Sequence, residues 1–222
     1  MPARDTAARP RLSRERVLQG AVAVADKGGI AALTIRSLAA ELGVKPMSVY
    51  HHVANKEEIL DGLVDLVFAE IELPTIGGEW HEEMRRRAAS AREAMRRHPW
   101  AIGLVETRTS PGHATLRHHD AVIGTLREGG FSVEMTAHAF ALIDAYVYGF
   151  ALSEATLPFN GPDTVPEVAE QMMEYFTPDE YPHLLGFTVE HVMKPGYDYS
   201  EEFEFGLGVV LDGLARSLSA ED

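Results

Sequence analysis

Imidazole is the group in this chain best suited to bind a metal or move a proton, because the 222 residues include ten histidines and no cysteine. A catalytic metal on one helix needs ligands three or four residues apart. The histidine pairs 51–52 and 118–119 are adjacent, so they point about a quarter-turn apart on a helix, and no H-x-x-x-H occurs. Glu134 and His138 have the right spacing but form a lone pair, which is typical of an exposed contact. We therefore expect no metal site.

Other catalytic patterns are also absent. Without cysteine the chain has no thiol nucleophile, no thiolate zinc site and no disulfide, which fits a reducing cytoplasm. No G-x-S-x-G segment and no phosphate-binding glycine loop occurs. We expect no catalytic residue and no cofactor, although a metal-dependent enzyme stays open as the least favoured class.

A different chemistry, the reading of DNA, is indicated near the N-terminus. Residues 1–56 hold nine lysines and arginines against four acids, a net charge of +5. Because the whole chain has a net charge of −14, the remaining residues carry −19. Lys45 can donate to guanine, Ser48 to several bases, and Met47 can contact a thymine methyl. These residues and His51 are the candidates for base contacts.

The segment around these side chains has the pattern of two helices joined by a tight turn. Thr34 is placed to cap a short helix, Ala39 is small enough for a close helix crossing, and Gly43 can supply the turn. Pro46 suits the first turn of the next helix, and Val49 would fill the angle between the two. A helix-turn-helix fits these features better than an ordinary helical hairpin does.

The remaining sequence predicts further helices and no strand. We expect helices at about 13–27, 34–42, 45–52, 55–73, 79–98, 99–108, 112–128, 132–156, 164–176, 179–193 and 199–219, broken by proline and glycine. The predicted fold class is all-α. We divide it into a basic arm (1–12), a three-helix DNA-binding module (13–58) and a larger helical domain for ligand binding and dimerisation (59–222).

The run from Val44 to Leu60, V-x-P-x-S-V-Y-H-H-V-x-N-K-E-E-I-L, follows L-T-I-R-S-L-A-A-E-L-G and resembles the DNA-binding module of the tetracycline-repressor (TetR) family. The resemblance is strong over residues 13–65. It continues loosely through H-P-W (98–100), T-R (107–108), G-F-S (130–132) and Y-x-x-G (146–149). Pro46 and Met47 differ from the tetracycline repressor itself, so its operator is not carried over.

The resemblance implies roles for further residues. Arg36 resembles a base-contacting arginine, and Tyr50, His52 and Lys56, with the amide ends at Thr34 and Asn55, resemble a phosphate clamp. A packing ring for Tyr50 and a solvated surface for the two histidines stay open. The predicted DNA contacts are Thr34, Arg36, Lys45, Pro46, Met47, Ser48, Tyr50, His51, His52 and Lys56.

Small residues recur every four positions in the helix at 132–156, at Ala137, Ala141, Ala145 and Gly149. Such a ridge allows another helix to approach closely, and the last helix is amphipathic, with Gly206 and Gly213 as flat positions. In the family, two such helices per chain form a bundle across a twofold axis. We expect a homodimer that binds two half-sites of a palindromic duplex, unless both ridges are used within one chain.

The expected partners are operator DNA and a small-molecule effector. The candidate effector contacts are Trp100, Thr107, Arg108, His118, His119, Met135, Tyr146, Tyr148, Phe150, Met172, Met173 and Phe176, each with core packing as the alternative. Thr107 and Arg108 resemble the family's relay segment. Gly103 and Leu104 stand where the tetracycline repressor has a metal-binding histidine nearby, which favours an apolar or aromatic effector over magnesium–tetracycline.

These features predict a DNA-binding transcriptional regulator, a repressor that an effector releases. The alternative is a constitutive DNA-binding protein without an effector. We expect it to be cytoplasmic, because no secretory signal is apparent and the apolar run from Phe140 to Leu152 is too short for a membrane span and contains Asp144.

Overall fold

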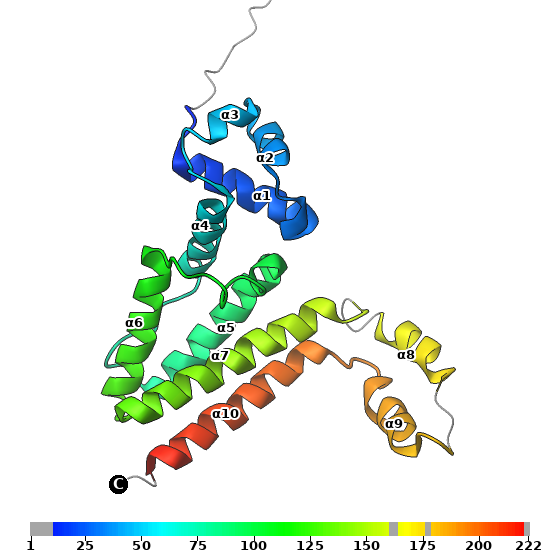
Figure 1. Ribbon diagram of the computed structural model, residues 1–222. Helices are drawn as coiled ribbons and strands as arrows, with labels where there is room; N and C mark the ends of the chain where they lie inside the picture. Colours follow the sequence, from blue (N-terminus) through cyan, green and yellow to red (C-terminus); the bar gives the residue numbers. More distant parts are fainter. Residues whose placement is uncertain (1–10, 160–163, 176–178, 220–222) are drawn as a thin grey trace, which may run out of the picture. The chain divides into compact units, whose positions relative to one another are not determined.

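The structure is a computed structural model that describes residues 11–159, 164–175 and 179–219 (Figure 1). Over these residues the chain is helical and contains no strand, as predicted. It divides into two compact units, which we describe separately. Unit 1 contains residues up to Ile71 and Glu93–His119, and unit 2 contains Glu72–Arg92 and Asp120 onward. The boundaries predicted at 12 and 58 stay a prediction, and most of the arm, residues 1–10, lies outside the described residues.

Unit 1 is built on α1 (Arg14–Ala32), α2 (Ile35–Leu42), α3 (Pro46–Val49) and α4 (Lys56–Ala69). Three of these helices have an N-cap residue whose side-chain oxygen accepts a hydrogen bond from a backbone amide of the first turn. Ser13 accepts from the Arg16 amide, Thr34 from Ser37 and Asn55 from Glu58. The end of α5 (Trp80–Arg97), the 3-10 turn η1 (Pro99–Ala101) and the start of α6 (His113–Glu128) complete the unit.

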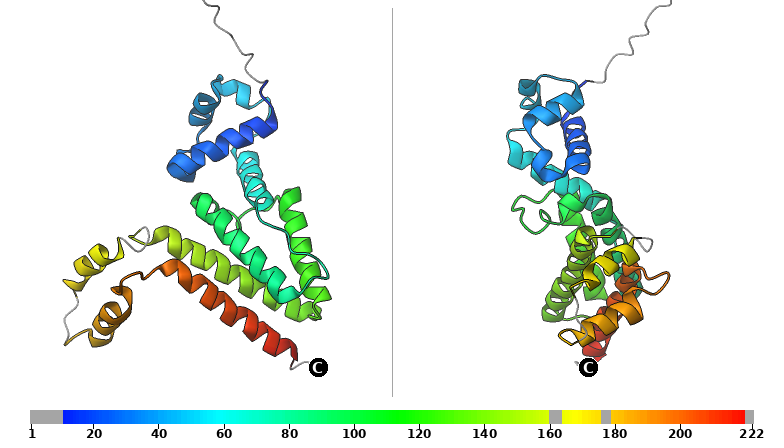
Figure 2. Two further views of the ribbon diagram at one scale, coloured as in Figure 1. Left: turned by 180° about the vertical axis from the view of Figure 1, so that it is seen from behind. Right: turned by 90° about the vertical axis from the view of Figure 1, so that its right-hand side faces the viewer.

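Unit 2 contains α7 (Val133–Thr156) and α10 (Glu202–Ser219), which lie side by side in Figures 1 and 2. Between them in the chain come α8 (Val165–Met173), α9 (Pro182–Phe187), the π-turn η2 (Thr188–Val192) and the 3-10 turn η3 (Tyr199–Glu201). Phe131, Ile143, Phe203 and Leu207 are buried in its core. The same core encloses an ion pair, Arg87 Nη1 to Asp144 Oδ1 at 2.5 Å.

Several predicted helices differ from the observed ones. The predicted stop at Gly29 is present (φ 72°), but one further helical turn follows to Ala32. The helix expected at 45–52 has a single turn, Pro46–Val49, after which Tyr50–His52 form a turn. The helix expected at 99–108 was wrong, because only Pro99–Ala101 is helical and turns follow. The helix expected at 179–193 begins at Pro182 and becomes the π-turn at Thr188.

Among the described residues, the helix α7 is long and apolar enough to cross a membrane by length and composition alone. Its Asp144 is 5% exposed and paired with Arg87, and eight of its residues are buried against the rest of unit 2. An ionisable residue paired inside the protein is typical of a helix that belongs to a protein core.

Candidate nucleic-acid interface and effector contacts

The turn between α2 and α3 is fixed by local hydrogen bonds. The Thr34 hydroxyl accepts from the Ser37 amide at 3.0 Å while the Ser37 hydroxyl accepts from the Thr34 amide at 2.9 Å, which closes the start of α2. Gly43 ends α2 in the left-handed region (φ 66°), and the Val44 amide reaches back to the Ala39 carbonyl at 2.9 Å. The chain therefore leaves α2 in one defined direction.

A buried face holds α3 against α1, α2 and α4. Val49 is fully buried and Val53 is 3% exposed, within a cluster that includes Leu18, Leu38 and Leu63. Pro46 occupies the first position of α3, where a missing N–H costs little. Since α3 has only one turn, its orientation depends on this apolar anchor rather than on its own hydrogen bonds.

The outer face of α3 and its flanks carries the residues predicted to contact DNA. Met47 is 69% exposed and Tyr50 is 44% exposed. Ser48 and His52 are partly exposed, and the other candidates, Thr34, Arg36, Lys45, Pro46, His51 and Lys56, are exposed. A long thioether side chain in solvent, beside lysines and hydroxyls, suits a surface that another molecule covers. The contacts themselves stay a prediction.

Ion pairing separates two sets of basic residues in unit 1. Lys27 pairs with Glu41 at 2.9 Å and Arg14 pairs with Glu58 at 3.0 Å. By contrast, the exposed cations Arg36, Lys45 and Lys56 form no ion pair with any residue that the structure describes. These three remain available to neutralise phosphates or donate to bases.

The start of α4, next to Lys56, is a reciprocal cap. Asn55 Oδ1 accepts from the Glu58 amide at 2.8 Å, and Glu58 Oε2 accepts from the Ala54 amide at 2.7 Å. The Ala54 amide, followed by Arg14, holds the pKa of Glu58 below its ordinary value. The first turn of α4 is thereby fixed, and it presents Lys56 to solvent.

Five of the predicted effector contacts lie in unit 1. Trp100 Nε1 donates to Asp26 Oδ1 at 2.7 Å, and the buried His98 bridges the same oxygen (2.7 Å) and Glu70 (3.2 Å). Asp26 of α1 and Glu70 at the end of α4 thus fix the position of the segment that follows α5. Asp26 and Glu70 have no signal in the local sequence, because their partners are 28 to 74 residues away in the chain.

The T-R segment packs on α4. Arg108 Nε donates to Asp61 at 2.6 Å and Arg108 Nη2 donates to Glu57 at 2.8 Å, and these two carboxylates raise the pKa of the arginine. Thr107 is exposed and donates to the Leu104 carbonyl at 3.0 Å. Arg108 therefore ties the turns after η1 to the first half of α4.

His118 and His119 form an aromatic group with Phe68. The His118 ring lies 5.1 Å and the His119 ring 5.4 Å from the Phe68 ring, and His118 is fully buried. The geometry matches the alternative of core packing for His118.

The remaining described candidates lie in unit 2. The Tyr146 hydroxyl donates to the Phe203 carbonyl at 2.9 Å, and Phe150 stacks on Tyr199 at 4.9 Å, with Arg92 5.0 Å from the Phe150 ring. Tyr148 is buried, whereas Met135 and Met173 are partly exposed. Met172 lines a small apolar cavity of about 140 Å³ beneath α8 and α9. Phe176 lies outside the described residues, and the predicted effector contacts stay a prediction.

One group of possible metal ligands is present among the described residues. Ligand atoms of Glu79, His81 and Glu82 lie within 4.8 Å of one another at the start of α5. However, both Glu79 oxygens accept backbone amides, of His81 at 3.2 Å and Glu82 at 2.8 Å. A helix cap accounts for this group without an ion.

Comparison with known proteins covers nearly the whole chain. Residues 17–63 match the family model for bacterial regulatory proteins of the tetR family, and residues 73–218 match that for the tetracyclin repressor-like C-terminal domain. The chain is 28% identical over 222 residues to an HTH-type transcriptional regulator of Saccharopolyspora erythraea, covering 99% of this chain and 92% of that protein. It is 30% identical to the HTH-type transcriptional repressor DrrR1 of Streptomyces coeruleorubidus, covering 93% and 78%.

A similar solved structure is that of apo ActR from Streptomyces coelicolor. It superposes with a TM-score of 0.79 at 25% identity, covering 97% of this chain and all of that one. ActR has also been solved in complex with actinorhodin, and that structure gives a TM-score of 0.76.

Proposed function

Because the chain belongs to the tetR family of bacterial regulatory proteins, we propose that it binds a palindromic operator as a homodimer and represses transcription until a small-molecule effector binds it. Regulators of this family bind operator DNA and small effectors and act as dimers. The observation that carries the proposal for this chain is the exposed face of α3. It combines an apolar Met47 with cations that have no partner within the described protein, over a buried valine anchor.

Dimerisation is supported by the exposed faces of α7 and α10. Ala137, Ala141, Ala145 and Gly149 are all exposed along α7, and Phe205 (73%) and Val209 (54%) are exposed on α10. Small residues on one helix and large apolar ones on its neighbour can interdigitate with the same faces of a second chain. A twofold dimer would place two α3 helices against half-sites about 34–36 Å apart.

Effector control is supported by the relatives. DrrR1 is named a repressor, and ActR has been solved with (S)-DNPA and with actinorhodin. An effector can weaken operator binding only through its different affinities for the two shapes of the dimer. The proposal includes no catalytic step and places the protein in the cytoplasm, where its DNA lies.

Selection of bound duplexes from a random pool tests the DNA-binding function directly. We expect enriched sequences with two inverted half-sites, spaced by about one helical turn. Enrichment of a single unrepeated site would contradict the dimeric operator, and no enrichment at low salt would contradict DNA binding.

Two substitutions then separate phosphate contacts from base contacts. Lys56→Ala removes one phosphate contact per chain, so the slope of log K against log salt should fall by about 1.8 in the dimer, for every duplex alike. Ser48→Ala should instead relax the preference at particular base pairs. Lys27→Ala is the matched control, since Lys27 is also an exposed lysine but is paired with Glu41. A salt slope that changes equally in both lysine variants would refute the assigned interface.

A further inference from the structure

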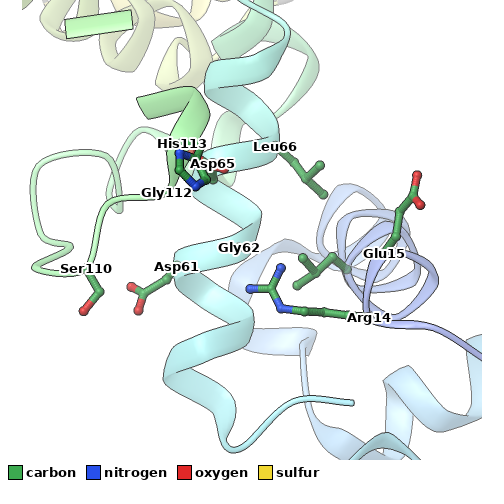
Figure 3. A pocket seen from close by; sticks show the side chains of 10 residues that line it. Arg14, Glu15, Asp61, Gly62, Asp65, Leu66, Ser110, Gly112 and His113 are labelled. Carbon is green, nitrogen blue, oxygen red and sulfur yellow. The ribbon is translucent and has the colours of Figure 1, made fainter. Parts of the chain in front are cut away.

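A cavity of about 510 Å³ lies within unit 1, where α1, α4 and the residues leading into α6 meet (Figure 3). Cavities that bind small molecules measure roughly 300–1,000 Å³. None of the effector contacts predicted from the sequence lines it, although Arg108 is bound to one lining residue, Asp61. Its lining residues are Arg14, Glu15, Leu18, Asp61, Gly62, Asp65, Leu66, Ser110, Gly112 and His113.

Two glycines shape the walls. A Cβ atom on Gly62 would lie 2.7 Å from the methyl groups of Leu18, so any larger residue there would have to displace that side chain. On the other wall, a Cβ atom on Gly112 would overlap the Asp65 carboxylate. Larger residues at either position would push the walls apart or fill the space between them.

The charge of the lining is mainly negative. The lining contains the carboxylates of Glu15, Asp61 and Asp65 and one guanidinium, that of Arg14, which is bound to Glu58 at 3.0 Å. Asp61 and Asp65 are four residues apart, so their carboxylates lie one turn apart on the same side of α4. The lining therefore attracts a cation more than an anion.

Asp65 is the carboxylate with no counter-charge. Its Oδ1 atom accepts from the Thr115 amide at 2.8 Å and from the Thr115 hydroxyl at 3.0 Å, and it forms no ion pair with an arginine or lysine of the described chain. Asp61, in contrast, is paired with Arg108 at 2.6 Å. Asp65 is only partly exposed, and its second oxygen remains to accept a donor. Figure 3 shows His113 beside it, a further polar group on the same wall.

The opposite wall is apolar, with Leu18 from α1 and Leu66 from α4. We propose that this cavity binds a small organic cation, an amine with an apolar body, whose ammonium group contacts Asp65 while its body covers Leu18 and Leu66. Leu18 belongs to the buried cluster that also holds Val49 of α3. The ligand would thus bind next to the core that orients the DNA-contacting turn.

Three indole compounds that differ in one group test the chemistry. Tryptamine carries an ammonium group, tryptophol a hydroxyl in its place, and indole-3-propionate a carboxylate. Each is titrated at pH 8 into the full chain without DNA, and the amide signals of Gly62 and Gly112 are followed by NMR. We expect tryptamine to shift both signals and to bind at least about tenfold more tightly than the other two, as befits a charge-assisted hydrogen bond.

Asp65→Asn removes the charge and keeps an oxygen for Thr115, and it should weaken tryptamine binding at least about tenfold. Asp120→Asn, at an exposed aspartate of α6 outside the cavity, should leave binding unchanged. The proposal is overturned if no compound shifts the two glycine signals at millimolar concentration, if the propionate or the alcohol binds as tightly as the amine, or if Asp65→Asn binds tryptamine normally. The compound series on the unaltered chain decides the question even if the variant does not fold. Since no DNA is present, its failure would leave the proposed function untouched.

Discussion

Replacing Asp144 tests whether the ion pair in the core of unit 2 is needed for stability. Arg87 is fully buried and Asp144 is 5% exposed, and their closest atoms are 2.5 Å apart. Asp144→Leu leaves the guanidinium without its counter-charge in the core, which typically costs about 3–5 kcal/mol. For a chain of 222 residues this corresponds to a decrease in Tm of about 6–20 °C.

The double variant Arg87→Met/Asp144→Leu provides the decisive comparison. Removing both charges also removes the cost of burying them, so the double variant should recover to within about 1 kcal/mol of the parent or exceed its stability. Glu154→Gln is the control at a more accessible pair, where Arg92 and Glu154 are 17% and 21% exposed, and it should cost about 1 kcal/mol or less.

The free energies of unfolding are measured in urea by circular dichroism, at one fixed protomer concentration, because the stability of a dimer depends on concentration. The reasoning is refuted if Asp144→Leu costs less than about 1 kcal/mol. It is equally refuted if the double variant is no more stable than the single one, since the cost would then come from lost packing rather than from an uncompensated charge.

Three further changes follow from local features. Gly43→Ala places a Cβ atom at φ 66°, so it should lower the free energy of unfolding by about 1–2 kcal/mol in urea melts. The Ala54 amide and Arg14 lower the pKa of Glu58 below 4.5, so the stabilising contribution of Glu58 is present above that pH and is lost as the pH falls. In melts at a series of pH values, Glu58→Gln should therefore slightly reduce the loss of stability on acidification. An unchanged loss would contradict the cap. Ala145→Arg puts a charge on the exposed ridge of α7 and should give a 24.4 kDa monomer by light scattering, whereas an unchanged dimer would exclude this interface.

Local signals in the sequence were enough to find the helix starts and the main turn. Thr34 and Asn55 cap their helices, and Gly43 adopts the left-handed conformation expected of it. Each of these outcomes depends on residues within four positions of one another, so a single sequence contains the required information. The exposure of Lys45, Met47 and Tyr50 around α3 was predictable for the same reason.

Contacts between distant segments were not predictable. The helix expected at 99–108 is replaced by turns, which Trp100 fastens to Asp26 and Arg108 fastens to Glu57 and Asp61. The periodicity of a short segment does not reveal such partners, which lie 47 to 74 residues away. The cavity beside Asp65 was missed for the same reason, since three separate segments form it.

The shortness of α3 limits how much DNA sequence one protomer could recognise through the proposed interface. Four helical residues rise about 6 Å along the axis, which is less than two base-pair steps of about 3.4 Å each. In the proposed complex each protomer would therefore contact only a few base pairs, so a sequence that is rare in a genome would have to be recognised by two protomers at a fixed distance. If this interface is used, substitutions at the exposed positions of α3 would change the preferred base pairs, while the buried Val49 and Val53 that hold the turn stay unchanged.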